Sequence, residues 1–430
     1  MDRGEGFPKQ FNNFSLMEAI FSRRSRRFGL GMEIPSGPLS FKSRKDPVPL
    51  TELEKYILVA AATGVSGWNF GVPFGPNSPD SHADFTVRFT GRTAPTPAGF
   101  GTPALFFTDD EGCYVTRTRD VKPERMRELE NIEDDLERII AVCRENTTRF
   151  QEGRLDLPAE PPHMLPPNLW MVNKPGSTIF IPVSDASEQF IALMALAASN
   201  GAMLVDHETG QPAGNLAPFV RSGLLNEAKQ LTLAEMQANV YEACCQETAF
   251  MAHNIVLVMQ AMGLGGLFFA GIDRWSVLGA RADQGVKGLG FRFARDERWQ
   301  FPNPVGLDGI YEALCPPYYA DMHAAVETFT KRKFGPDGAY NPELPGPWKD
   351  SAAVKGSVTP YSREFIDCLG EMAQYVYDKY GKFPGTLTTI MVPGSVQAVH
   401  IDTEYYDTYY KPGAYLQSHA EHMKVWHREK

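Results

Sequence analysis

The chain has 430 residues, a formal net charge of -10 and a pI near 5.5. This acidic balance argues against a nucleic-acid-binding protein, because phosphate backbones require broad positive surfaces. No apolar run approaches the roughly 18 residues that a membrane span needs, and the N-terminus has no apolar signal-peptide core. The six cysteines show no CxxC pairing. We therefore expect a cytoplasmic protein without disulfides, a membrane partner or a nucleic-acid partner.

The first predicted helix begins near residue 15. Ser15 and Glu18 have the spacing of a capping box, in which each side chain satisfies a free backbone amide of the other residue. Leu16, Ala19 and Ile20 then form a short apolar stripe. The pattern predicts one buried face on a short helix.

A second capping box, Thr51 with Glu54, opens a helix that Gly64 is placed to end. A loop, Val65 to Asn69, follows it directly. Farther along, strand-like runs on either side of the turn residues 109–112 predict a hairpin at 104–108 and 113–117. Helical patterns, proline content and an apolar run predict a helix at 122–150, a surface loop at 152–167, a buried strand at 177–183 and a helix at 188–199.

Residues 248–262 are apolar almost all round, which predicts a helix buried in the domain or at a subunit interface. Gly263 and Gly265 end it, and a short apolar run follows. From about residue 296 the chain is rich in proline. That part is expected to contain a helix near 363–380 and strands at 387–392 and 397–401.

The arginine stretch, Ser22-Arg23-Arg24-Ser25-Arg26-Arg27, concentrates positive charge in an otherwise acidic chain. Such a cluster suits a small anionic ligand, because the planar guanidinium fork matches phosphate oxygens with charge-assisted hydrogen bonds. A second interpretation stays open, since cations at the C-terminal end of a helix also complement its dipole on a solvated face.

Three separated pieces of the chain together resemble the nitroreductase family of FMN enzymes. The first is Arg23-Arg24-Ser25-Arg26-Arg27, and the second is Ser66-Gly67-Trp68-Asn69. The third runs from His253-Asn254 through Ala261-Met262-Gly263-Leu264-Gly265 to Phe269-Ala270-Gly271-Ile272-Asp273. Their order along the chain agrees with the family's order.

The resemblance implies a set of FMN-binding residues: Arg23, Arg24, Ser25, Arg27, Ser66, Asn69, Ala270 and Gly271. The first four would contact the phosphate, the ribityl chain and the pyrimidine edge of the flavin. The next two would reach it from the neighbouring subunit of a homodimer with shared active sites. The last two would lie near N5, where a small residue leaves space for a stacked substrate. For a late phosphate contact, only Lys331 or Arg332 is suggested.

The resemblance also implies an α+β fold with a nitroreductase-like mixed sheet flanked by helices. Family domains are shorter than this chain. We therefore expect an FMN-binding domain at 1–295 with a large insertion at about 75–240, followed by a C-terminal extension at 296–430 whose role is unknown.

The implied function is that of an FMN-dependent oxidoreductase, a flavoprotein that passes hydride from NADH or NADPH through flavin N5 to an organic acceptor such as a nitroaromatic or a quinone. Because the flavin carries the chemistry, no catalytic side chain is named. Two alternatives remain open: a specialised flavin dehydrogenase or oxidase in biosynthesis or catabolism, and a non-catalytic flavin-binding dimer.

Histidines near the C-terminus raise a different hypothesis. His419 and His422 are three apart on an expected helix, with His427, His400 and Asp402 nearby in the sequence. Zinc uses such ligands. Polar helices late in a chain are usually surface features, however, so we expect no metal site.

Overall fold

The computed structural model describes residues 9–72, 87–97, 99–119, 121–129, 131–132 and 134–427. Its helices are α1 (Lys9–Asn12), α2 (Leu16–Phe21), α3 (Glu52–Thr63), α4 (Pro123–Leu129), α5 (Asp135–Glu145), α6 (Ala186–Ser199), α7 (Ala217–Arg221), α8 (Leu233–Met262), α9 (Arg274–Leu278), α10 (Met322–Phe334), α11 (Ser351–Gly356), α12 (Arg363–Tyr380), α13 (Thr403–Tyr409) and α14 (Gln417–Trp426), with short 3-10 helices at Pro166–Asn168 and Ala282–Gln284.

The strands are β1 (Glu33–Ile34), β2 (Phe41–Lys42), β3 (Val65–Trp68), β4 (Thr90–Arg92), β5 (Ala104–Thr108), β6 (Gly112–Thr116), β7 (Thr147–Glu152), β8 (Thr178–Asp185), β9 (Ala202–Val205), β10 (Asn226–Thr232), β11 (Gly265–Phe269), β12 (Arg292–Ala294), β13 (Asn303–Leu307), β14 (Tyr311–Glu312), β15 (Ile390–Met391) and β16 (Ser395–Val399). Helices and sheets mixed in this way give an α+β fold. Among the described residues, no helix is both long and apolar enough to cross a membrane.

The central sheet has the order β11-β16-β8-β5-β6-β7, and β15 also pairs with β8. All of its pairings are antiparallel, so the expectation of a mixed sheet is wrong for this sheet. A hairpin joins β5 to β6, and a tight connection of this kind is available only to antiparallel strands. Parallel pairing occurs instead between β9 and β10.

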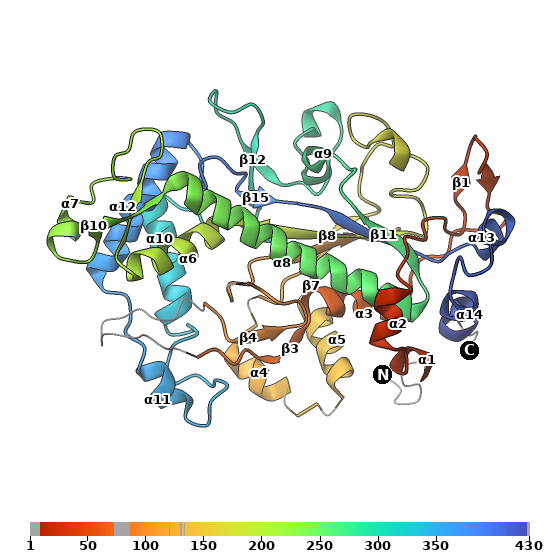
Figure 1. Cartoon of the computed structure of the whole chain (residues 1–430), viewed down its shortest axis with the longest axis horizontal. Coiled ribbons are helices and arrows are strands. Elements are labelled where there is room, and N and C mark those ends of the chain that lie inside the picture. Colours follow the sequence, from red (N-terminus) through yellow and green to blue (C-terminus); the bar gives the residue numbers. More distant parts are fainter. Residues whose placement is uncertain are drawn as a thin grey trace.

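Both faces of the sheet are buried. In β5, Leu105 and Phe107 point to one apolar cluster, while Ala104 and Phe106 point to the other. This alternation follows from the two-residue period of a strand. Helices α3 and α8 cover the first face, and the long helix α8 crosses the molecule in Figure 1. A sheet covered on both faces explains why every residue of β8 is buried.

The sheet does not follow the expected division of the chain. Residues 75–240, expected as an insertion, supply β5, β6, β7 and β8, and residues 296–430, expected as an extension, supply β15 and β16. β16 lies between β11 and β8, in the middle of the sheet. The two ends of the described chain also meet, because the rings of Phe11 and Trp426 lie 5.7 Å apart (Figure 1). The last segment is therefore part of the core.

Several local expectations are confirmed. The capping box of Thr51 with Glu54 is present at the start of α3, and the hairpin β5–β6 and helix α12 lie where the sequence places them. The buried helix near 248–262 is the second half of α8, which begins at its own capping box, Thr232 with Glu235. Local hydrogen-bonding residues thus mark where these helices begin.

Two other expectations are wrong. Ser15 precedes α2 but makes no capping hydrogen bond through its side chain, and of the apolar stripe only Ala19 is buried. The single helix expected at 122–150 is divided into α4 and α5, followed by β7. Asp134 accepts a hydrogen bond from the Glu137 amide and so begins a new helix within the expected one.

Candidate functional site

The arginine stretch lies against the start of β11. The backbone oxygen of Arg26 accepts a hydrogen bond from the Gly266 amide at 2.6 Å. Gly266 has a φ of +139°, and a Cβ there would lie 1.8 Å from the backbone oxygen of Gln397. Only glycine allows this approach. Of the three pieces that resemble the nitroreductase family, the first (the arginine stretch) and the third (around Gly265) therefore meet within one chain.

The side chains of the stretch divide into two groups. Arg26 is buried; its Nη1 donates to Gln260 Oε1 at 2.8 Å and its Nε to the Ala414 oxygen at 2.9 Å. Burial lowers the pKa of Arg26. The four residues assigned to FMN are all exposed: Arg23, Arg24, Ser25 and Arg27. None of their three guanidinium groups has an ion-pair partner among the described residues. They are available to an external anion.

The second piece of the motif lies elsewhere in the chain. Ser66 is exposed on β3, and Asn69 is half-buried, with its amide donating to the Phe89 oxygen at 2.7 Å. In Figure 1, β3 lies apart from α2 and β11, and so does α10, which carries Lys331 and Arg332. The structure of one chain therefore does not bring Ser66, Asn69 or this pair of cations to the arginine stretch.

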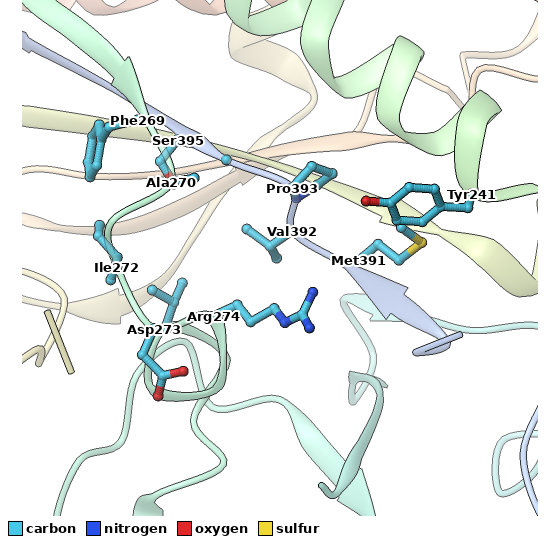
Figure 2. Close-up of a pocket in the computed structure, with 12 residues that line it drawn as sticks. Tyr241, Phe269, Ala270, Ile272, Asp273, Arg274, Met391, Val392, Pro393 and Ser395 are labelled. Carbon is cyan, nitrogen blue, oxygen red and sulfur yellow. The ribbon is translucent and has the colours of Figure 1, made fainter. Parts of the chain in front are cut away.

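Ala270 follows β11 and lines a cavity of about 360 Å³ (Figure 2). Asp273 and Arg274 border it from the start of α9, and Val392 and Pro393 border it from the segment between β15 and β16. A cavity of this size falls in the range of small-molecule sites. It opens at the end of β11 opposite the arginine stretch.

Gly271 does not leave the expected open space. It is buried, and a Cβ there would lie 1.9 Å from Nδ2 of Asn168. The Gly271 oxygen accepts hydrogen bonds from the Leu165 amide at 3.0 Å and from Asn168 Nδ2 at 3.2 Å. Leu165 and Asn168, at the 3-10 helix Pro166–Asn168, therefore fill the space beside Gly271. Of the two residues, Ala270 is the one that lines the cavity described above.

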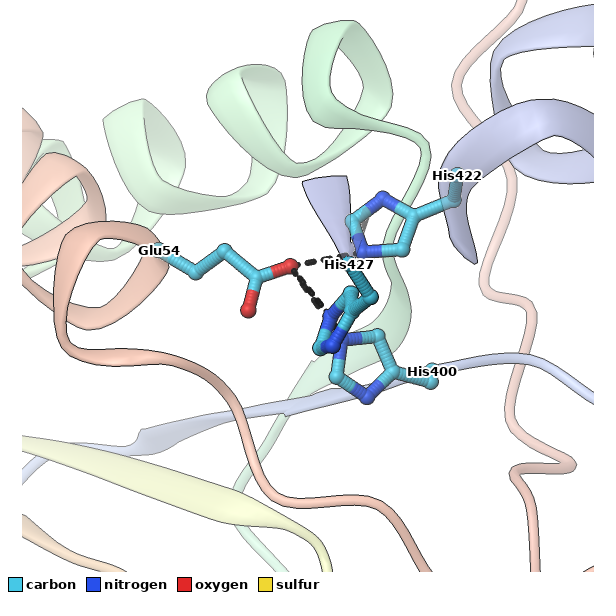
Figure 3. A group of neighbouring side chains, drawn as sticks. All are labelled: Glu54, His400, His422 and His427. Carbon is cyan, nitrogen blue, oxygen red and sulfur yellow. Dashed lines mark hydrogen bonds and ion pairs between the residues drawn. The ribbon is translucent and has the colours of Figure 1, made fainter. Parts of the chain in front are cut away.

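Four titratable side chains from distant parts of the sequence meet beneath the C-terminal end of α8 (Figure 3). We call Glu54, His400, His422 and His427 the histidine cluster. Glu54 Oε1 lies 3.2 Å from His400 Nε2, 2.6 Å from His422 Nε2 and 3.3 Å from His427 Nε2. The Nε2 atoms of His400 and His427 are 3.2 Å apart. Glu54, His400 and His422 are buried, and His427 is half-buried.

Backbone contacts fix the orientation of this cluster. Nδ1 of His400 lies 2.8 Å from the Val48 oxygen, and Nδ1 of His422 lies 2.8 Å from the Met262 oxygen. A carbonyl oxygen only accepts hydrogen bonds, so both Nδ1 atoms carry the proton. In the neutral imidazole, Nε2 is then an unprotonated nitrogen that points at Glu54.

Glu54 has two roles, one for each oxygen. Oε2 accepts hydrogen bonds from the Thr51 amide at 2.6 Å and from its hydroxyl at 2.8 Å, which completes the cap of α3. Oε1 is left to face the histidines. Burial raises the pKa of Glu54, but hydrogen bonds that His400, His422 and His427 donate when their Nε2 atoms are protonated lower it by more, so the pKa lies far below its usual range. The carboxyl group is therefore ionised.

The expectation that the late histidines lie on a surface helix is wrong. His400, His419 and His422 are all buried. His419 is not in the cluster; burial, with Arg26 and His422 nearby, lowers its pKa to about 3. Asp402 instead caps α13 and accepts a hydrogen bond from Ser43. Of the five residues that the sequence suggested as metal ligands, three therefore come together: His400, His422 and His427.

Sequence reasoning missed Glu54 as a member of this cluster. In the sequence, Glu54 is recognisable only as the last residue of the capping box that begins with Thr51. That role uses one of its two carboxylate oxygens. His400 lies 346 positions away from it, so no local spacing links the two. The one available signal was the concentration of histidines after residue 400.

Comparisons with known proteins leave the family open. No family model matches the chain, and no curated protein matches it. A solved structure of a candidate nitroreductase from Ralstonia eutropha JMP134 is 14% identical and covers 64% of this chain and 75% of that chain, with a TM-score of 0.28. A score this low carries no argument about function. The α+β architecture and the two sites described above therefore rest on this chain's own residues.

Proposed function

We propose that the chain is an FMN-dependent oxidoreductase of the nitroreductase type, with the flavin phosphate held by the arginine stretch. The observation that carries the proposal is the set of three exposed guanidinium groups, Arg23, Arg24 and Arg27, without ion-pair partners among the described residues. In a chain of net charge -10, such a concentration of unpaired positive charge favours a bound anion.

The residues around β11 fit an elongated ligand with one anionic end. The five residues of β11 span roughly 16 Å at about 3.3 Å per residue, and they connect the arginine stretch to the cavity beside Ala270. In this proposal the arginines hold the phosphate and Ala270 borders the ring. Gly271 does not fit the role of an open stacking surface, because Asn168 fills the space beside it.

Ser66 and Asn69 enter the proposal as residues of a second copy. One chain does not bring them to β11, so the site would be completed in a homodimer. The surface around α2 is consistent with a covered face: Leu16, Met17 and Phe21 are each more than half exposed. Apolar residues that gather on one exposed helix favour contact with another surface.

When bound, FMN supplies hydride transfer between NAD(P)H and an organic acceptor such as a nitroaromatic or a quinone. The residues of the chain bind the flavin and orient it. Arg23, Arg24 and Arg27 neutralise the phosphate, while Phe269 and Val392 give the cavity beside Ala270 apolar side chains against which a ring can pack. No side chain is assigned an acid or base role.

The colour and flavin content of the purified protein test the proposal. We expect a yellow protein that releases FMN on denaturation. The double variant Arg23→Ala with Arg24→Ala should lose most of its FMN while keeping the circular dichroism of the wild type. The control, Arg221→Ala with Lys229→Ala, removes the same charge from exposed residues elsewhere and should keep its FMN. A colourless wild type that takes up no added FMN would contradict the proposal.

Anaerobic mixing with NADH and NADPH separates the alternatives. Bleaching of the flavin by either nucleotide supports the reductase. A flavin that neither nucleotide reduces, but that an organic substrate reduces and oxygen reoxidises, indicates the specialised dehydrogenase or oxidase. A flavin that no donor reduces indicates a non-catalytic flavin-binding dimer.

A further inference from the structure

We propose that the histidine cluster, Glu54, His400, His422 and His427, is a binding site for a divalent transition-metal ion, with Zn²⁺ as the ion that its ligands match best. The inference is independent of the flavin proposal, because none of the four residues belongs to the FMN motif. It rests on the identity of the ligand atoms, their spacing, their orientation and their supporting contacts.

The ligand set is three imidazole nitrogens and one carboxylate oxygen. Zinc binds such ligands at about 2.0–2.2 Å, with four ligands in a tetrahedral arrangement. A tetrahedron of that radius places its ligand atoms about 3.3 Å apart. The observed separations of Glu54 Oε1 from the Nε2 atoms are 2.6, 3.2 and 3.3 Å, and all four atoms lie within 4.8 Å of one another. A small cation fits this spacing with little rearrangement.

The orientation of two rings presents their nitrogens as ligand atoms. Nδ1 of His400 and Nδ1 of His422 each face a backbone oxygen, so in the neutral ring the proton lies on Nδ1 and the Nε2 lone pair points at Glu54. A neutral Nε2 in this orientation is the form of imidazole that binds a metal ion. A divalent ion accepts all the lone pairs and neutralises the carboxylate.

Supporting contacts of the kind that orient metal ligands are already present. The Val48 oxygen holds the ring of His400, and the Met262 oxygen holds the ring of His422. Thr51 holds the second oxygen of Glu54 through two hydrogen bonds. Metal-binding histidines usually donate their other nitrogen in this way, which fixes the tautomer and the direction of the ring.

The site joins three parts of the chain that are far apart in sequence. Glu54 comes from α3, His400 follows β16, and His422 comes from α14. His427, directly after α14, is the member with solvent exposure, with 17% of its side chain accessible, so the ion has a route to the site. Four protein ligands leave no open position for a substrate, which is typical of structural zinc. We infer that the metal fixes the C-terminal segment against the core.

The test measures metal content and zinc affinity directly. The wild-type chain, produced in zinc-supplemented medium and purified without chelator, should carry about one zinc per chain by mass spectrometry. Removal of the metal with a chelator should lower Tm by about 5 °C or more, and added Zn²⁺ should restore it. These readouts do not depend on flavin or on any activity.

Two variants and a matched control locate the site. His422→Ala should abolish zinc retention. Because a buried change can also unfold the chain, His427→Gln tests the same site from its exposed side and should weaken zinc binding at least about 100-fold. The control is His419→Asn, on the same helix but outside the cluster. Its Nδ1 accepts from the Leu416 amide at 3.3 Å, a bond that asparagine can replace, and the variant should keep its zinc.

Three results would overturn the proposal. The first is a folded wild type that carries no metal and takes up none of Zn²⁺, Co²⁺, Mn²⁺ or Fe²⁺. The second is a folded His427→Gln variant with wild-type zinc affinity. The third is a loss of zinc in His419→Asn as large as that in His422→Ala. Loss of FMN without loss of zinc, or the reverse, separates the two proposals made for this chain.

Discussion

The arginine stretch and the histidine cluster lie near the same end of α8, yet they place charge in opposite environments. Arg23, Arg24 and Arg27 are exposed and unpaired among the described residues, while Glu54 and His422 are buried and in contact. Exposed charges cost little to keep solvated and can bind a ligand that arrives from outside. Buried charges must be matched within the fold. The first region therefore points to an external ligand, and the second to an ion held inside the protein.

Removal of the Glu54 carboxylate should have the largest effect. Glu54→Ala takes away both hydrogen bonds from Thr51 and the partner of three histidines. We expect a loss of about 3–5 kcal/mol of unfolding free energy, measured by denaturant titration. Glu52→Ala is the control on the same helical turn, because its carboxylate is exposed and pairs at the surface with Arg144. It should cost less than about 1 kcal/mol. Equal losses would show that the cluster is energetically unimportant.

A change that touches no ligand should also disturb the cluster. Gly263 ends α8 with a φ of +82°, and a Cβ there would lie 2.1 Å from the Ser418 oxygen on α14. Gly263→Ala should therefore displace α14, release the metal and destabilise the chain by about 2–4 kcal/mol. Gly285→Ala is the control, since its φ is +87° but no atom lies within 4 Å of the added Cβ. It should cost about 1 kcal/mol and leave zinc in place.

Within the arginine stretch, neighbouring residues should behave differently. Arg27→Ala should weaken FMN binding by about 10- to 100-fold, the value of one or two charge-assisted hydrogen bonds, and leave the melting temperature unchanged. Arg26→Ala should instead lower the melting temperature, because it leaves Gln260 and the Ala414 oxygen without their buried donor. Flavin titration and thermal melts of both variants check this. The same effect from both variants would show that Arg26 and Arg27 do not differ in their roles.

The smallest expected effect is a pH dependence from His419. Its pKa is lowered from 6.5 to about 3, so the unfolded chain binds a proton more readily than the folded chain between these values. Stability from this residue is complete above pH 6.5 and falls as the pH drops toward 3. Between pH 7 and 5.5 we expect a loss of about 1 kcal/mol. Denaturant titrations of His419→Asn should show a shallower dependence over this range than those of the wild type.

Local sequence predicted much of the secondary structure correctly. Thr51 with Glu54 begins α3, the turn residues at 109–112 between two strand-like runs mark the hairpin of β5 and β6, and the helix at 363–380 has the bounds of α12. These features depend on contacts between residues a few positions apart, which any folded context preserves. The helix expected at 122–150 failed because Asp134, in its middle, caps a new helix. Aspartate occurs both inside helices and at helix N-caps, and the tertiary structure decides which of the two positions it takes.

The sequence by itself determined that an acidic chain carries one concentrated positive segment and a group of histidines near its end. Only the tertiary structure decided which arginine is buried, that Asn168 fills the space beside Gly271, and that His400, His422 and His427 meet Glu54. The reason is physical. A helix cap or a tight turn depends on residues only a few positions apart. The protonation and pairing of a buried group depend instead on which distant segments surround it.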